Sequence, residues 1–136
     1  MRRWMILGVL LLGLAAPGAR AGGAEEAIRD VIARQIEAFK ADDFETAFGF
    51  ASPAIKRMFG TPARFGQMVQ SGYPMVWRPA QVRFAGLSAG RDAMIQGVVI
   101  TDAAGGVHLI EYHMVEDAEG WRINGVLVRR PGDAGA

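Results

Sequence analysis

The sequence has 136 residues, which is enough for one domain with a single hydrophobic core but not for two. Its 15 basic and 14 acidic residues nearly balance, and without the three arginines of the first 21 residues the rest is mildly acidic, which argues against nucleic acid as a partner because phosphate binding needs a basic stripe. The absence of cysteine excludes disulfides and also the lipid-modified cysteine that would tether an exported bacterial protein to a membrane.

The first residues have the pattern of a signal peptide. Residues 1–4 form a basic n-region, residues 5–16 form an apolar h-region, and Ala19-Arg20-Ala21 is a small-x-small cleavage site. The apolar run is too short to span a bilayer, which takes about 20 residues. We therefore expect cleavage after Ala21, export to the periplasm or the medium, and no membrane anchor on the mature chain. An uncleaved N-terminal anchor is the alternative.

Residues 22–136 would then form a single mature domain that begins with a long helix. Without Arg2, Arg3 and Arg20 the mature chain has 12 basic residues against 14 acidic ones. A helix is predicted over residues 24–41, where one apolar stripe has helical spacing; its members are Ile28, Val31, Ile32, Gln35, Ile36 and Phe39. A helix with one such stripe is expected to lie across an apolar sheet face.

Short helices are predicted after the long one. Asp42 is placed to cap the first, with Glu45 three residues on in a capping-box-like pattern. Ser52-Pro53 and Thr61-Pro62 each combine an N-cap hydroxyl with proline at the first helical position. Gly60 and Gly72 are expected to end these two helices, whose predicted buried residues are Ile55, Met58, Phe59, Phe65, Met68 and Val69.

From residue 73 the period changes to that of strands. Tyr73 to Trp77 is interpreted as a short strand stopped by Pro79, and further strands are predicted over residues 81–87 and 93–101. Residues 107–129 read as a hairpin with its turn at residues 117–120. Helices first and antiparallel strands in meander order afterwards predict an α+β domain without repeats or linkers.

The alternation along the hairpin predicts which residues share a face. Regular pairing around the turn would place Met114 opposite Ile123, Tyr112 opposite Gly125 and Ile110 opposite Leu127, on an apolar face with Trp121. The opposite face would then carry Leu109, Glu111, His113 and Val115 beside Arg122, Asn124, Val126 and Val128.

Several motifs in this order resemble an uncharacterised family of bacterial exported proteins, catalogued as a domain of unknown function. They are IEAFKADDFETAFGFASP, MFGTPARFGQMV, a strand with an internal Gln and a closing GWRINGVLV. That family looks like part of the nuclear transport factor 2-like superfamily, an α+β cone in which a long helix and short helices pack into a strongly bent sheet. Members include isomerases, dehydratases, polyketide cyclases and binding modules, so the resemblance implies a fold but no activity.

Two sets of residues are candidates for a site. For acid–base chemistry, Glu111 and His113 share a face, and Gln96 is expected opposite His113; Tyr112 and Asp43 are the other groups to test. The competing interpretation is a cross-strand polar patch. For ligand binding, Tyr73, Trp77, Tyr112 and Trp121 have the apolar bodies and polar handles that suit the mouth of a cone, although ordinary core packing is the alternative for Trp121.

We expect a non-catalytic exported module that binds a small apolar ligand or a partner, with a small lyase, isomerase or hydrolase as the alternative. No cofactor is expected. Two histidines five apart in a strand point to opposite faces, so no metal site is expected either. A homodimer through the mixed face of the sheet is also predicted, where the branched side chains would be covered; its residues are Gln96, Val98, Glu111, His113 and Val126.

Overall fold

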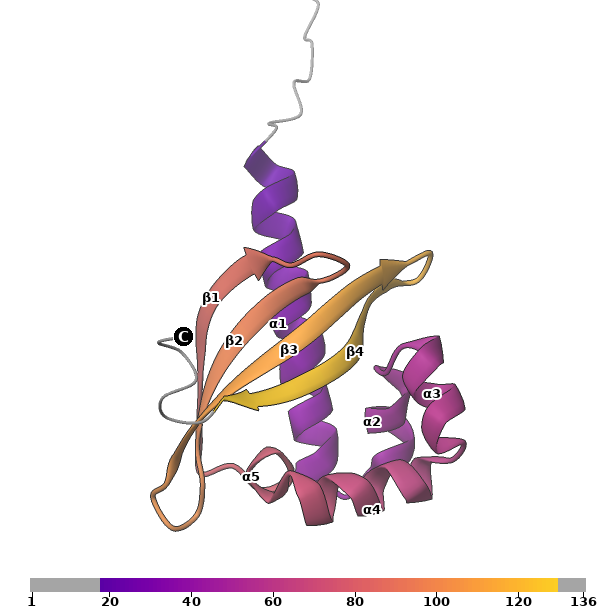
Figure 1. The fold of residues 1–136 in the computed structure, drawn as a ribbon, viewed down its shortest axis with the longest axis vertical. Helices are drawn as coiled ribbons and strands as arrows, with labels where there is room; N and C mark the ends of the chain where they lie inside the picture. Colours follow the sequence, from indigo (N-terminus) through magenta and orange to yellow (C-terminus); the bar gives the residue numbers. More distant parts are fainter. Residues whose placement is uncertain (1–17, 130–136) are drawn as a thin grey trace, which may run out of the picture.

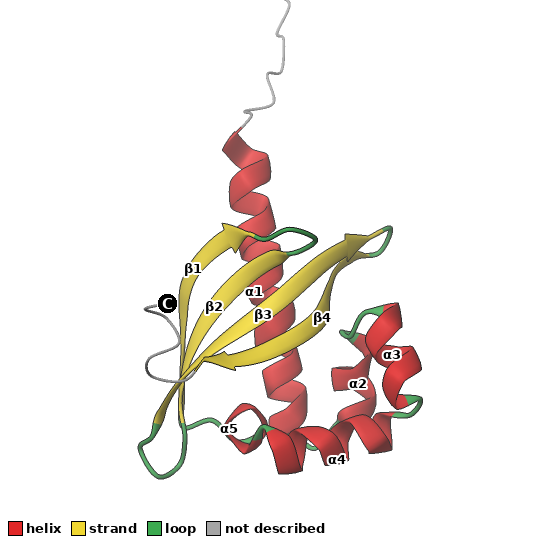
Figure 2. Ribbon diagram, viewed as in Figure 1, coloured by secondary structure: helices red, strands yellow, loops and turns green. Residues whose placement is uncertain are grey.

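The computed structural model describes residues 18–129, with all helices preceding all strands (Figures 1 and 2). The helices are α1 (Gly18–Lys40), α2 (Phe44–Gly49), α3 (Pro53–Phe59), α4 (Pro62–Gly72) and α5 (Pro74–Trp77). The strands are β1 (Gln81–Ala89), β2 (Met94–Thr101), β3 (Val107–Asp117) and β4 (Gly120–Arg129). They form one antiparallel sheet in the order β1-β2-β3-β4, which confirms the predicted α+β fold and its meander.

Most of the expected signal peptide lies outside the described residues, and the expected cleavage site Ala19-Arg20-Ala21 falls in the first turns of α1. Within the described part of the chain, no helix is both long and apolar enough to cross a membrane.

The helix caps follow the sequence pattern with one correction. Ser52 and Thr61 accept hydrogen bonds from the backbone N–H groups of Ile55 and Arg64, as N-cap hydroxyls do. Asp43, and not Asp42, caps α2, because Asp42 adopts a left-handed conformation (φ 56°) that turns the chain after α1. The N-cap of α2 therefore lies one residue later than the sequence pattern predicts.

Residues 74–77 form the short helix α5 and Tyr73 caps it, so the short strand predicted over residues 73–77 is wrong. Pro74 takes the first position of α5, where its missing N–H costs no hydrogen bond. The N–H groups of Val76 and Trp77 donate to the Tyr73 carbonyl, and that of Arg78 donates to Pro74. This single turn closes the gap between α4 and the first strand.

Helix α1 lies across the inner face of the curved sheet, and its apolar stripe forms the centre of the core (Figure 1). Ile28, Ile32, Ile36 and Phe39 are at most 3% exposed. They pack with fully buried residues of β2 and β3, which are Val98, Ile100, Ile110, Tyr112 and Met114. Fully burying a side chain of this size stabilises a fold by about 1.5–3 kcal/mol, so this contact dominates the stability of the domain.

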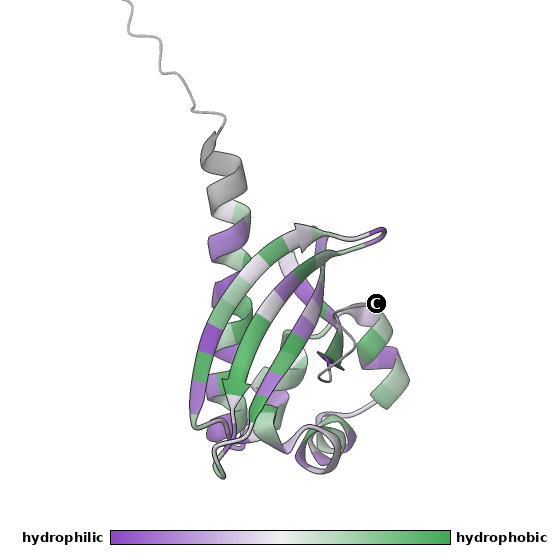
Figure 3. Ribbon diagram, turned by 60° about the vertical axis from the view of Figure 1, so that its left-hand side comes forward, coloured by the Kyte–Doolittle hydropathy of each residue, from purple (hydrophilic) through white to green (hydrophobic). Residues whose placement is uncertain are grey.

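The register of the sheet differs from the regular pairing expected from the sequence. Met114 pairs with Ile123 as predicted, but Tyr112 pairs with Val126, because Asn124 is an extra residue that forms a β-bulge in β4. Beyond the bulge the alternation is reversed, so Val126 and Val128 lie on the inner face and Leu127 on the outer face. Figure 3 shows the alternation of hydrophobic and hydrophilic residues along the strands.

The bulge lies where the chain between α2 and α3 joins the sheet. Ala51 forms a parallel bridge with Ile123, and Ser52 N–H donates to the Ile123 carbonyl at 2.8 Å. The Ser52 hydroxyl donates to Asn124 Oδ1 at 2.7 Å and accepts from Ile55 N at 3.3 Å. Ser52 is 1% exposed. One buried hydroxyl thus caps α3 and attaches it to β4.

We expect Ser52→Ala to lower the free energy of unfolding by about 2 kcal/mol, because the variant loses both a helix cap and the hydrogen bond to Asn124 that attaches α3 to β4. The matched control is Thr61→Ala, which removes only an exposed cap and should cost about 1 kcal/mol or less. Urea unfolding of both variants measures the difference. Equal losses would contradict a role for Ser52 beyond capping.

Candidate functional site

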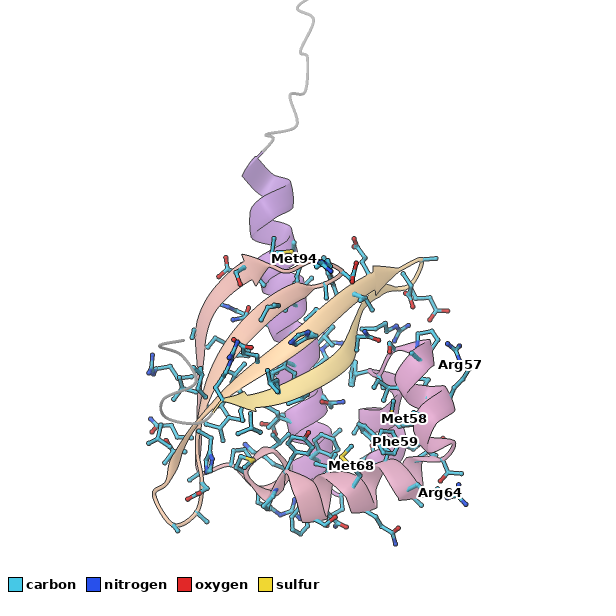
Figure 4. All side chains as sticks on the ribbon, in the orientation of Figure 1. Arg57, Met58, Phe59, Arg64, Met68 and Met94 are labelled. Carbon is cyan, nitrogen blue, oxygen red and sulfur yellow. The ribbon has the colours of Figure 1, made fainter. Side chains whose placement is uncertain are left out.

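An apolar cavity of about 360 Å³ lies between α1, α3, α4 and β4, with α5 and the residue before it closing one end. Figure 4 shows Met58, Phe59 and Met68 gathered between α3 and α4, whereas Arg57 and Arg64 point outward. The residues that line the cavity are Gln35, Phe39, Ala51, Ile55, Met58, Phe59, Phe65, Met68, Val69, Tyr73, Val76, Ile123, Gly125 and Val126.

The two capped helices form the outer wall of the cavity. Gly60, at φ 80°, ends α3 in a conformation that favours glycine, and Thr61-Pro62 starts α4 immediately after it. This sharp corner turns the apolar sides of both helices toward β4. Met58 is 70% exposed although it lines the cavity, so the cavity opens to solvent beside α3. The expectation that Met58 is buried is therefore wrong.

Aromatic rings form the inner end of the cavity. Phe65 of α4 lies between Phe39, Phe48 and Phe59, with ring centroids 5.3–5.8 Å apart. Contacts of this kind prefer tilted or edge-to-face geometry, as seen here, and they hold the rings in fixed orientations. The inner end of the cavity is therefore formed by a packed cluster that also belongs to the core.

Among the residues that the structure describes, two side chains with hydrogen-bonding groups line the cavity. Gln35 is 2% exposed and donates from its amide nitrogen to the Ala47 carbonyl at 3.1 Å. The Tyr73 hydroxyl donates weakly, at 3.5 Å, to the Val126 carbonyl. Of the four residues predicted to contact a ligand, Tyr73 is the one that lines this cavity. Gln35 was predicted only as part of the helical stripe and not as a site residue. It is the one polar residue in that apolar stripe, and this is the sequence signal that could have identified it as a candidate site residue.

Trp77 lies on the other side of α5, in a polar clamp at the end of α1. Its ring nitrogen donates to Asp42 Oδ1 at 2.9 Å, and Arg78 donates to the same oxygen at 2.9 Å while its guanidinium lies over the indole ring. These hydrogen bonds, that from Trp77 first, hold the pKa of Asp42 below its ordinary value. Trp77 thus fixes α5, and with it the neighbouring Tyr73.

Tyr112 and Trp121 do not line this cavity. Tyr112 is fully buried on the inner face of the sheet, its hydroxyl has no hydrogen-bond partner among the described residues, and burial raises the pKa of its phenol. Trp121 lies instead in a separate surface groove beside Val31, Phe50 and Arg122. The alternation along the hairpin cannot distinguish the two environments, because it assigns Tyr112 and Trp121 to the same face of the sheet.

The candidate acid–base residues are not brought together. Asp43 caps α2, where the hydroxyl and the N–H of Thr46 donate to it and lower the pKa of its carboxyl. Glu111 forms an ion pair with Arg129 at 3.1 Å on the outer face of the sheet. His113 shares that face, as predicted, but it pairs with Ile95 and not with Gln96.

The predicted dimer face also needs correction. Gln96 and Val98 are fully buried on the inner face, and Val126 lines the cavity, so only Glu111 and His113 of the predicted set lie outside. For Gln96 and Val98 the reason is a turn one residue different from that expected. Asp102 accepts from Ala104 N and Gly106 N and contacts His108, and in this turn Thr101 pairs with Val107. Gln96 then pairs with Tyr112. For Val126 the reason is the bulge in β4.

No group of three or more acidic or histidine side chains suited to a metal ion occurs within the described part of the chain. The fold and the site thus define an α+β protein with a one-sided curved sheet and an apolar cavity beside its last strand.

The chain belongs to the family described as Domain of unknown function (DUF4864), whose sequence profile matches residues 22–136. The match agrees with the resemblance to an uncharacterised family drawn from the motifs. Comparison with curated proteins gives no significant match, and neither does comparison with solved structures.

We expect Asp42→Asn to flatten the loss of stability in acid. Asparagine tolerates the left-handed conformation, so the variant removes the charge alone. Because the pKa of Asp42 is lowered on folding, its carboxylate stabilises the protein above the ordinary value of 3.8, and this contribution disappears as the pH falls through the lower folded pKa. Wild type should therefore lose more stability than the variant between about pH 6 and pH 3.

Urea unfolding at each pH, followed by tryptophan fluorescence, measures this difference. Asp92→Asn is the control, since Asp92 is an exposed residue without an ion pair among the described residues. Parallel pH profiles for wild type and Asp42→Asn would show that the clamp does not depend on charge.

Proposed function

We propose that this protein is an exported, non-catalytic binding protein that holds one small apolar ligand in the cavity between α3, α4 and β4. The observation that carries the proposal is an open cavity of about 360 Å³ whose lining is apolar apart from Gln35 and Tyr73. Small-molecule sites have volumes of about 300–1,000 Å³ and the same composition, mostly apolar with a few polar groups. A water molecule in the liquid occupies roughly 30 Å³, and at that volume per non-hydrogen atom the cavity holds a ligand of about a dozen such atoms.

The lining favours binding over acid–base catalysis. No aspartate, glutamate or histidine is among the described residues that line the cavity, and these are the commonest acid–base groups of the alternative class of enzyme. Glu111 and His113 lie on the outer face, and Asp43 is held by Thr46 at the start of α2. The lyase, isomerase or hydrolase alternative therefore lacks a site at this cavity.

The wider relationship and the compartment are part of the proposal. A long helix and short helices against one face of a curved four-stranded sheet support membership of the nuclear transport factor 2-like superfamily. The n-region, h-region and small-x-small site of residues 1–21 support export to the periplasm or the medium.

Filling the cavity should abolish binding. We expect Met68→Trp to weaken the binding of 1-methylnaphthalene, an apolar probe of suitable size, by at least about tenfold, because the larger ring occupies the space between α3 and α4. Met94→Trp is the matched control, since Met94 lies at the other end of the sheet and does not line the cavity (Figure 4). Naphthalene fluorescence during titration gives both affinities, and thermal unfolding checks that the variants fold.

If Met68→Trp bound 1-methylnaphthalene as tightly as wild type, the probe would bind outside this cavity. If wild type did not bind the probe, the proposal would lose its basis.

The outer face of the sheet supports a second part of the proposal, a homodimer formed through residues other than those first expected. Leu109 and Leu127 are 37% and 46% exposed on this face, and Ile95 and Val99 lie between them and β1. Glu111 and Arg129 neutralise each other there. Pairing two such faces would bury apolar area that a single copy leaves in water.

Leu127→Lys should therefore convert a dimer into a monomer in sedimentation at micromolar concentration, because the variant places a charge in the centre of the interface. The control is Met58→Lys, which adds the same charge at an exposed methionine on α3. A monomeric wild type would overturn this part of the proposal, and an unaffected Leu127→Lys dimer would move the interface away from the sheet.

A further inference from the structure

Gln35 is the most buried hydrogen-bonding side chain of the cavity lining, and its hydrogen bonds determine what it offers to a ligand. A carbonyl oxygen can only accept, so the side-chain atom that faces the Ala47 carbonyl at 3.1 Å is the amide nitrogen. The amide oxygen therefore points elsewhere. Among the described residues it has no hydrogen-bond partner.

This oxygen is not sealed inside the protein. Gln96 Oε1 and the Tyr112 hydroxyl are enclosed without a partner, whereas Gln35 Oε1 is not enclosed in this way. Since Gln35 as a whole is only 2% exposed and lines the cavity, the cavity is the space that the oxygen faces. An acceptor in an apolar cavity gains most from a ligand that donates a hydrogen bond to it.

The other groups in the cavity limit the charge of that ligand. No lysine or arginine is among the described residues that line the cavity, and Arg57 and Arg64 of its two outer wall helices point outward (Figure 4). A carboxylate or phosphate inside would face the Gln35 oxygen, acceptor against acceptor, with no cation to balance its charge. The Tyr73 hydroxyl stands at a second point of the lining and is held only by its 3.5 Å contact with the Val126 carbonyl.

Building on the proposed function, we infer that the cavity selects a neutral apolar ligand that carries a hydroxyl group, and that this hydroxyl donates a hydrogen bond to Gln35 Oε1. The ligand class is an uncharged alcohol or phenol with a compact hydrocarbon body. Gln35 is the residue that determines specificity, and the surrounding phenylalanine and methionine side chains contact the body.

Three probes of one shape test this inference. 1-Naphthol and 1-methylnaphthalene differ only by hydroxyl for methyl, and 1-naphthoate places a carboxylate on the same ring system. Wild type should bind 1-naphthol about tenfold more tightly than 1-methylnaphthalene and should not bind 1-naphthoate measurably. Equal affinity for the first two probes would overturn the inference while leaving the proposed function in place.

Gln35→Met is the decisive variant, because methionine keeps the length of the side chain and removes the acceptor. The Ala47 carbonyl keeps its hydrogen bond from Phe50 N–H, so α2 retains its last turn. We expect the preference for 1-naphthol over 1-methylnaphthalene, measured as the ratio of the two affinities in the same variant, to fall to about one. A preference that persists in this variant would overturn the assignment.

Tyr73→Phe tests whether the second polar group of the lining is the one that recognises the ligand. Its preference for 1-naphthol should remain about tenfold, since the hydroxyl of the ligand is assigned to Gln35. A preference lost in Tyr73→Phe and kept in Gln35→Met would overturn the inference in favour of Tyr73. Absence of binding by all three probes to wild type would overturn the inference and the proposed function together.

Discussion

Helix α1 packs its apolar stripe against the inner face of the sheet, and this contact determines which other surfaces can be buried. A single long helix covers β2 and β3, where side chains are fully enclosed. The first half of β4 also lies against α1, and the inner residues farther along β4 face α3 and α4 across the cavity. A four-stranded sheet is wider than one helix, so the space beside β4 is completed by short elements that fit less closely.

The cavity results from how those short elements are attached. Ser52 fixes the start of α3 to β4, Gly60 sets the corner between α3 and α4, and Asp42 holds α5 to the end of α1. None of these attachments passes through the space between the helices and the strand. The walls are therefore held at their ends, and the space between them is left open.

The fold was predictable to the extent that local patterns determine it. Three predictions that depend only on residues close together in the sequence are confirmed. They are the helical stripe of residues 28–39, the caps at Ser52 and Thr61, and the closing hairpin. Face assignment failed at Gln96, Val98 and Val126, since it depends on the number of residues in a turn and on a bulge. The period of hydrophobic residues along a strand reveals neither the length of the turn nor the presence of the bulge.

The candidate site was predictable only in part, for the same reason. Tyr73 was identified by its residue type and irregular surroundings, and it is the non-helical residue that joins α4 to α5. Trp77, Tyr112 and Trp121 have equally suitable side chains, but the clamp at Asp42, the depth of the core and the groove beside α1 take them elsewhere. Which aromatic residue meets a cavity is decided by tertiary contacts between distant segments.

The bulge at Asn124 gives β4 two halves whose alternation is out of phase. Relatives that lack one residue at this position would keep the same residues inward, because Gly125 would then follow Ile123 opposite His113 without any change of partners. Loss or gain of a residue elsewhere in the strand would exchange Val126 and Leu127 between the two faces. Evolutionary variation in the length of β4 is therefore expected at Asn124, accompanied by a change at Ser52, which would lose its acceptor.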